Sequence, residues 1–270
     1  MDNNTQIYIQ NYDRVANCVV MEGAVSLNAL VTGGTKGLGL VTARRLSAEG
    51  YRVFVCGRTD PEDLEGLEFL RCDVRDPQDV AAMIDGIRQR AGPLHVLVNN
   101  AGGSPPSDAA TASPRFAEKI VGLNLMAPLW LSQAVHADMA QNGGSIINIS
   151  SVSALRPSPG TSVYAAAKGG LVALTRSLAN EWGPNIRVNA VVVGYIETEQ
   201  TSATYGTDGT QAAISRNIGL KRLGRSQEIA EAVAWLASEA SSYVSGAVLE
   251  VHGGGERPAF LDILERSQTA

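Results

Sequence analysis

The sequence predicts an α/β protein built on a single doubly wound parallel sheet of the Rossmann type, with about seven strands and helices on both faces. Short apolar runs that end in turn residues alternate with helical patterns along most of the chain. A glycine-rich turn joins the first predicted strand to the first predicted helix. Neither an internal repeat nor a linker interrupts residues 27–255, so this stretch is expected to form one domain.

The composition fits this class and argues against several others. The chain has 270 residues, of which 44% are hydrophobic and 18% charged, enough for one sizeable core. Its net charge is −5 and it lacks a basic run, so nucleic acid is not a predicted partner. No apolar run reaches the roughly 18 residues of a membrane span. The N-terminus lacks a signal-peptide pattern, and Cys18, Cys56 and Cys72 show no metal-ligand spacing. We therefore expect a cytoplasmic protein with reduced thiols and no metal.

The order of the predicted elements is that of repeated strand–helix units. Residues 1–26 are expected to form an arm of unassigned role and residues 256–270 a C-terminal tail. Segments 103–114 and 156–160 are predicted loops, and the polar segment 199–219 is a predicted mobile lid. Strands are expected at 29–31, 51–56, 69–74, 95–98, 145–149, 186–193 and 248–251, and helices at 38–49, 77–90, 119–142, 164–182 and 226–236.

The stretch from Thr32 to Gly39 has the features of a dinucleotide-binding turn. It follows a buried strand and opens a helix, which is the context that such a turn requires. Gly33 permits the tight turn, and Gly37 lets the backbone approach a pyrophosphate. Gly39 lets the helix lie close to the strand. The pattern predicts a nicotinamide dinucleotide at this edge of the sheet.

The residues after the second strand indicate which nicotinamide cofactor is bound. An acidic residue here pairs with a ribose 2′-hydroxyl, whereas an arginine accommodates a 2′-phosphate. Arg58 lies just past the strand, and Lys36 lies in the glycine turn. Asp60 also follows, but Asp60-Pro61 is typical of a loop that begins a helix. The two cations favour NADP(H) over NAD(H).

Tyr164 and Lys168 are four residues apart with only alanines between them, so on a helix they lie on one face. A fixed cation within about 4–6 Å lowers the pKa of a neighbouring acid by roughly 1–3 units. Such a tyrosine can exchange a proton with a substrate oxygen. The same spacing is common on helix surfaces, so the assignment depends on the other motifs. One of these is a serine, Ser150 or Ser151, at the carboxyl end of a central strand.

Taken together, these motifs resemble the short-chain dehydrogenase/reductase family over about residues 27–255, and most closely its 3-oxoacyl-thioester (acyl-carrier-protein) reductases. The thirteen residues from Ser151 to Tyr164 match the family spacing and favour Ser151 over Ser150. The matching positions are Thr32, Gly33, Gly37, Gly39, Asp73, the run Asn99-Asn100-Ala101-Gly102, Asn124, Ser151, Tyr164, Lys168 and the segment from Gly194 to Thr198.

The resemblance implies a role for each catalytic candidate. Tyr164 is the general acid in ketone reduction and the general base in alcohol oxidation. Lys168 lowers the pKa of Tyr164 and holds the nicotinamide ribose. Ser151 donates a hydrogen bond to the substrate oxygen, and Asn124 anchors a water in a proton relay.

The cofactor site is implied in the same way. The family usually has proline where this chain has Val193, so the nicotinamide edge is expected to be more mobile here. The residues assigned to the cofactor are Gly33, Thr35, Lys36, Gly37, Leu38, Gly39, Arg58, Thr59, Asp73, Val74, Asn100, Ala101, Gly102, Tyr164, Lys168, Gly194, Ile196 and Thr198.

Three functional hypotheses follow. The first is an NADPH-dependent carbonyl reductase acting on a small-molecule ketone such as a 3-oxoacyl thioester. The second is a dehydrogenase that oxidises a secondary alcohol, sugar or steroid. The third, of another class, is a cofactor-sensing or scaffold protein without turnover. The four-residue Tyr164–Lys168 spacing argues against double-bond reduction, because related enoyl reductases place these residues farther apart.

The resemblance also implies a homo-oligomer, either a tetramer or a dimer. The expected contacts are the helices at 119–142 and 164–182. The tail carries Phe260, Leu261 and Leu264, which are predicted to anchor it on a neighbouring subunit.

Overall fold

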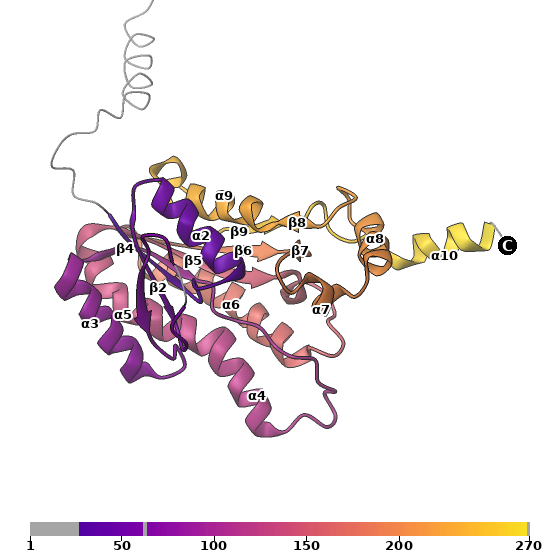
Figure 1. Ribbon diagram of the computed structural model, residues 1–270, viewed down its shortest axis with the longest axis horizontal. Coiled ribbons are helices and arrows are strands. Elements are labelled where there is room, and N and C mark those ends of the chain that lie inside the picture. Colours follow the sequence, from indigo (N-terminus) through magenta and orange to yellow (C-terminus); the bar gives the residue numbers. More distant parts are fainter. Residues whose placement is uncertain (1–26, 62–63, 269–270) are drawn as a thin grey trace, which may run out of the picture.

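A seven-stranded parallel sheet forms the centre of the protein in the computed structural model, which describes residues 27–61 and 64–268 (Figure 1). Every neighbouring pair of strands in this sheet is parallel, as the alternation of strand and helix predicted. The α/β class is therefore confirmed. In sheet order the strands are β3 (Glu68–Arg71), β2 (Arg52–Gly57), β1 (Asn28–Thr32), β4 (Leu94–Asn99), β5 (Gly144–Ser151), β6 (Ile186–Val193) and β9 (Val248–Val251).

Helices cover both faces of the sheet: α2 and α9 lie on one face, and α3, α5 and α6 lie on the other (Figure 1). A second, two-stranded sheet pairs β7 (Ile196–Glu197) with β8 (Gly224–Arg225). The helices described are α2 (Gly37–Ala48), α3 (Pro77–Ala91), α4 (Pro114–Val121), α5 (Ala127–Asn142), α6 (Ser162–Glu181), α7 (Thr201–Tyr205), α8 (Asp208–Asn217), α9 (Ser226–Ala237) and α10 (Ala259–Gln268), with short turns of other helix types at Gly122–Met126, Val152–Ala154 and Glu239–Ser241.

The core is two apolar layers separated by the sheet. Side chains of β1 alternate between them: Val31 packs towards α2 and α9, and Leu30 packs towards α3 and α5. All five residues of β1 are buried, as expected for a central parallel strand covered on both faces. Cys56 and Cys72 are free and buried in the second layer, which agrees with the expectation of reduced thiols; Cys18 and the predicted arm 1–26 lie outside the described residues.

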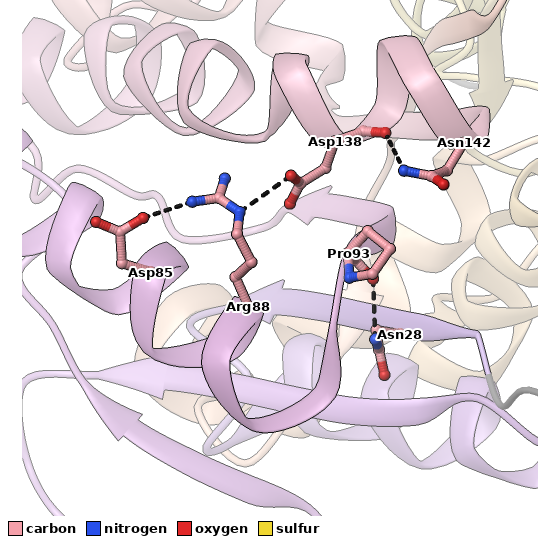
Figure 2. Close-up of polar contacts among 6 residues, drawn as sticks. All are labelled: Asn28, Asp85, Arg88, Pro93, Asp138 and Asn142. Carbon is pink, nitrogen blue, oxygen red and sulfur yellow. Dashed lines mark hydrogen bonds and ion pairs between the residues drawn. The ribbon is translucent and has the colours of Figure 1, made fainter.

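Polar contacts hold the amino end of the sheet to the helices beside it (Figure 2). Arg88 of α3 donates to Asp138 of α5 at 3.0 Å and to Asp85 at 2.5 Å. The Asn28 amide is buried and donates to the carbonyl of Pro93 at 2.9 Å. Exposed ion pairs contribute only about 0.2–1 kcal/mol each. The Arg88–Asp138 contact links α3 to α5, and apolar packing supplies most of the stability.

The helix predicted at 119–142 differs from the structure in two ways. It begins earlier, at Pro114, where the Ser113 hydroxyl accepts a hydrogen bond from the Phe116 backbone N–H. It is also interrupted by a π-helical turn, Gly122–Met126, before α5 begins. The buried Asn124 amide donates to the carbonyl of Ile120 at 2.9 Å, and this side-chain bond competes with the helical pattern.

Segment 199–219, predicted as a mobile lid with few periodic signals, contains two short helices, α7 and α8, and its mobility stays a prediction. Asp208 in the first turn of α8 is a helix-start signal that the polar composition obscured. Two boundaries also shift slightly. The third strand ends at Arg71 instead of 74, and the N-cap of α9 is Arg225 instead of Ser226 or Gln227.

None of the helices within the described residues is long and apolar enough to cross a membrane. Within the same residues, no group of three or more His, Cys, Asp and Glu side chains lies close enough together to hold a metal ion.

Candidate active site

A large crevice opens at the carboxyl ends of β1 and β4, where the strand order reverses direction. In open α/β sheets this switch point is where ligands bind. The crevice has a volume of about 1100 Å³, and the glycine turn after β1 forms one of its walls. Fourteen of the predicted cofactor residues line it: Gly33, Thr35, Lys36, Gly37, Leu38, Gly39, Arg58, Thr59, Asp73, Val74, Asn100, Ala101, Gly102 and Thr198.

The glycine turn is held in a form that only glycine tolerates. Gly33 and Gly37 have positive φ angles of 63° and 53°. A Cβ on Gly39 would lie 2.3 Å from the carbonyl oxygen of Gly33 and 2.5 Å from the side-chain amide of Asn100. That amide donates to the carbonyl of Thr32 at 2.9 Å. The turn thus exposes its backbone and the N-terminus of α2 to the crevice, an arrangement that fits a dinucleotide pyrophosphate.

This packing predicts a sharp difference between two glycine substitutions. Gly39→Ala is expected to destabilise the fold by about 1–3 kcal/mol, because its new methyl group meets backbone atoms that cannot move away. Gly86→Ala in α3 is the matched control: its Cβ meets open space, so it should stabilise by about 0.5–1 kcal/mol. Urea unfolding and NADPH titration of both variants check this. Equal stability of the two would contradict the close packing of α2 on the turn.

The predicted cations also line the crevice. Lys36 and Arg58 are both exposed there. Asp60, the acidic alternative for a ribose hydroxyl, is instead ion-paired with Arg71 at 2.7 Å. Asp73 is bound by Arg75, whose hydrogen bonds and charge lower the pKa of the Asp73 carboxyl. The crevice lining thus includes two exposed cations, and Asp60 and Asp73 are each ion-paired with an arginine.

A second cavity of about 270 Å³ adjoins the crevice and shares Leu38, Asn100 and Gly102 with it. The carboxyl end of β5 contributes Ser151 and α6 contributes Tyr164 and Lys168 to its lining. Gly194, at the end of β6, closes another side. The structure therefore brings the predicted tyrosine, lysine and serine to one cavity beside the predicted cofactor crevice.

The acidity of Tyr164 differs from the sequence-based expectation. Burial raises the pKa of Tyr164, and a hydrogen bond with Ser151 only partly opposes this rise. The predicted lowering by Lys168 is wrong for this geometry. The Lys168 ammonium lies 5.8 Å from the centroid of the Tyr164 ring and donates at 2.7 Å to the carbonyl of Ile149. Its charge is directed at the strand, and burial lowers the pKa of Lys168 itself to about 8.

The two serines are already distinguished by their contacts. The Ser150 hydroxyl is buried and donates to the backbone carbonyl of Lys168 at 3.3 Å. The Ser151 hydroxyl accepts from the backbone N–H of Ser153 and lies within hydrogen-bonding reach of Tyr164. Of the two, only Ser151 interacts with the tyrosine, which supports the assignment made from its spacing.

Asn124 is buried next to this cavity and does not line it. Its side chain accepts from the N–H of Gly103 at 2.9 Å and donates to the Gly103 carbonyl at 3.0 Å. A Cβ on Gly102 would lie 2.8 Å from the Asn124 oxygen and 3.2 Å from the Lys168 nitrogen. Asn124 and Lys168 therefore flank the same glycine, and the water-relay role of Asn124 stays a prediction.

Two predicted features are placed differently or stay open. Ile196 lies in β7 and lines a separate cavity of about 90 Å³ with His252, so it is not brought to the crevice. Val193, which replaces the usual proline, is buried inside β6 and pairs with Ser151 on one side and Val251 on the other. Greater mobility at this position stays a prediction.

Sequence reasoning missed several residues that line the site, among them Tyr205 and Arg75. Tyr205, the last residue of α7, lines the cavity with Tyr164. It lies in a five-residue helix, which is too short to produce a periodic pattern. Arg75 lines the crevice and holds Asp73. The spacing Asp73-Val74-Arg75 was the only local sign of this ion pair.

A doubly wound sheet with a glycine turn, a dinucleotide-sized crevice and an adjoining Ser–Tyr–Lys cavity defines a nicotinamide-dependent oxidoreductase class. Residues 33–256 match the family described as Enoyl-(Acyl carrier protein) reductase, which is more than half of the chain. The chain belongs to the short-chain dehydrogenase/reductase family, as its motifs predicted, and is an oxidoreductase.

Similar proteins include both reductases and dehydrogenases. The 3-oxoacyl-acyl-carrier-protein reductase MabA of Mycobacterium tuberculosis is 38% identical over 234 residues, which cover 85% of this chain and 93% of MabA. A single-substitution variant of the actinorhodin polyketide ketoreductase, solved with NADPH, has a TM-score of 0.81 at 31% identity and covers 85% of this chain and 97% of its own. Ligand-free aldohexose dehydrogenase of Thermoplasma acidophilum has the same TM-score at 32% identity, covering 85% of this chain and 93% of its own.

Proposed function

We propose that this protein is an NADPH-dependent carbonyl reductase that reduces a ketone, with a 3-oxoacyl thioester as the leading substrate class. The observation that carries the proposal is that the two cavities share lining residues, so that Ser151, Tyr164 and Lys168 lie next to a crevice that Lys36 and Arg58 also line. Similarity to MabA and to an NADPH-bound ketoreductase supports the choice of substrate and cofactor.

Each side chain has a task in this proposal. When bound, the nicotinamide supplies hydride to the carbonyl carbon. Ser151 donates a hydrogen bond to the carbonyl oxygen and stabilises the negative charge that develops there. Tyr164 gives its phenolic proton to the same oxygen. Its raised pKa keeps Tyr164 protonated at neutral pH, which is the form that an acid catalyst needs. Lys168 holds the nicotinamide ribose and returns a proton to the site.

The substrate and direction are tested with the purified chain and a panel of substrates. The panel holds simple ketones, 3-oxoacyl thioesters, secondary alcohols and aldohexoses, each assayed with both nicotinamide cofactors. We expect the highest kcat/KM for a 3-oxoacyl thioester with NADPH. A higher value for an alcohol or sugar would favour the dehydrogenase function suggested by the likeness to aldohexose dehydrogenase. The four-residue spacing of Tyr164 and Lys168 argues against double-bond reduction, so an enoyl thioester is included as a negative control.

The cofactor preference predicts the effect of one charge reversal. Arg58→Asp should weaken NADPH binding by about 10- to 100-fold, because it removes a charge-assisted hydrogen bond to the 2′-phosphate and adds repulsion. NADH binding should change by less than about threefold, because NADH has no 2′-phosphate. Fluorescence titration gives both dissociation constants. Arg90→Asp is the matched control, since it reverses the same charge at an exposed residue of α3 that does not line the crevice. Unchanged NADPH binding in Arg58→Asp would exclude this phosphate site.

We also propose that α10 packs on a second copy of this chain. The helix projects away from the domain (Figure 1), and Phe260, Ile263 and Leu264 are 59%, 67% and 51% exposed. A ten-residue helix is marginal in water without tertiary packing. Truncation after Pro258 should therefore shift the sedimentation coefficient to that of a smaller assembly. If assembly is unchanged, the tail does not hold subunits together.

A further inference from the structure

Three side chains from distant parts of the sequence meet beside the catalytic cavity, and we call them the Arg156 cluster. Arg156 follows the catalytic serine strand, Tyr195 follows β6, and Glu256 precedes α10. One guanidinium nitrogen of Arg156 donates to the Tyr195 hydroxyl at 2.7 Å and lies 2.5 Å from the Glu256 carboxylate. The guanidinium carbon is also 5.7 Å from the centroid of the Tyr195 ring.

The Arg156 cluster is connected to the cavity through aromatic packing. The rings of Tyr195 and Tyr205 meet edge to face, with centroids 5.6 Å apart and an interplanar angle of 82°. Tyr205 lines the same cavity as Tyr164 and is close enough to raise the pKa of Tyr164. A chain of contacts therefore runs from Arg156 through Tyr195 to one wall of the catalytic cavity.

The Arg156 cluster also lies beside the C-terminal end of the segment that carries Tyr205. Backbone hydrogen bonds hold that end to the C-terminal part of the chain. Glu256 forms an isolated backbone bridge with Ile218, directly after α8. The N–H of Arg257 donates to the Asn217 carbonyl at 2.8 Å, and the N–H of Leu220 donates to the Gly253 carbonyl at 2.8 Å. Glu256 thus ties both the guanidinium and the end of α8 to the C-terminal segment.

Because the Arg156–Glu256 ion pair is partly buried, it should stabilise the local structure more than an exposed ion pair does. The side chains of Arg156 and Glu256 are 32% and 23% exposed, so the pair is better shielded from solvent than the exposed Arg71–Asp60 pair. A hydrogen bond to a charged group contributes more than one between neutral groups. The guanidinium also has a planar, fixed arrangement of donors, which orients the Tyr195 ring as well as holding it.

We propose that Arg156 is a positioning residue that fixes Tyr205, through Tyr195, as a wall of the substrate cavity and so limits which ketones fit. This proposal rests on the proposed reductase function for its kinetic consequence. Arg156 itself does not line the catalytic cavity, so it acts through its neighbours and not on the reacting atoms.

The experiment compares Arg156→Met, Tyr195→Phe and the double variant in two measurements. Hydrogen exchange by mass spectrometry reports the protection of residues 199–217, and steady-state kinetics report KM and kcat for the best ketone of the panel. Arg156→Met should speed exchange in that segment and raise KM about three- to tenfold, with kcat and the NADPH dissociation constant changed less than about twofold. The double variant should be no worse than Arg156→Met, because both changes remove the same contact.

Arg45→Met is the matched control. Arg45 forms a 2.7 Å ion pair with Glu231 between α2 and α9, away from both cavities, so its removal should leave exchange in 199–217 and KM unchanged. Unchanged exchange and KM in Arg156→Met would overturn the proposal. If the effects of Arg156→Met and Tyr195→Phe on exchange and KM are additive in the double variant, Arg156 does not act on Tyr205 through the Tyr195 hydroxyl. Faster exchange in a chain that reduces no ketone would support the positioning role and reject the reductase function instead.

Discussion

Replacing Tyr164 with phenylalanine is expected to lower kcat for ketone reduction by about 10²- to 10⁴-fold, the usual contribution of a general acid. The change removes the phenolic proton and leaves the ring, so the packing of α6 should persist. NADPH affinity should change by less than about twofold, because the lining of the crevice stays intact. Steady-state kinetics and fluorescence titration measure the two effects separately.

Tyr205→Phe is the matched control for this substitution. Tyr205 lines the same cavity and loses the same hydroxyl, but it lies in α7 and the proposed mechanism gives it no part in proton transfer. Its kcat should stay within about threefold of the wild type. A Tyr164→Phe variant that reduces ketones at the wild-type rate would remove Tyr164 from the mechanism. A wild-type chain that binds NADPH but reduces no member of the panel would instead favour the cofactor-sensing hypothesis.

The pH dependence of reduction follows from the same group. Because burial raises the pKa of Tyr164, the phenol stays protonated throughout the neutral range. Ionisation of Tyr164 should therefore not affect reduction by the wild type near pH 7, and the loss of activity that comes from deprotonating this phenol should appear only as the pH rises through its elevated pKa. The sequence-based expectation of a lowered pKa would have placed that loss nearer neutrality.

The fold and the cofactor crevice could be predicted because their signals are local. Buried strands such as β1 contain continuous apolar runs. Gly33, Gly37 and Gly39 indicate the backbone conformation of the turn, because other residues do not fit there. Each of these inferences needs only neighbouring residues, and the structure agrees with it.

The features that were missed depend on distant residues. The π-helical turn forms because Asn124 bonds to Gly103, on another loop, as well as to Ile120. Arg156 and Glu256 are 100 positions apart in the chain, and no pattern connects them. The acidity of Tyr164 depends on how deeply the tertiary structure buries it. Spacing alone placed Tyr164 and Lys168 on one helix face but could not show that Lys168 reaches towards Ile149.

The second substitution with a large expected effect is at Lys168, whose ammonium group is buried. Lys168→Met should abolish most activity, with a loss of about 10²-fold or more, since it removes the group proposed to hold the ribose and return the proton. It should nevertheless stabilise the fold. Burial lowers the pKa of Lys168 from 10.5 to about 8, and this difference corresponds to a penalty of about 3 kcal/mol at neutral pH. The variant also loses the hydrogen bond from Lys168 to the Ile149 carbonyl, which costs about 1–2 kcal/mol of stability. A net stabilisation of about 1–2 kcal/mol therefore remains.

The pH dependence of this gain separates desolvation from improved packing. Between pH 8 and 10.5 the unfolded wild type binds more protons than the folded protein, so wild-type stability rises with pH in this window. The advantage of Lys168→Met should be complete below pH 8 and shrink as the pH rises, and it should reach zero between about pH 9 and 10, where the remaining charge penalty equals the cost of the lost hydrogen bond. Urea unfolding of both proteins at about pH 7 and about pH 9.5 measures it, with Lys119→Met as the exposed control. An advantage that is equal at both pH values would come from packing alone, and a variant less stable than the wild type at neutral pH would mean that the buried ammonium is net stabilising.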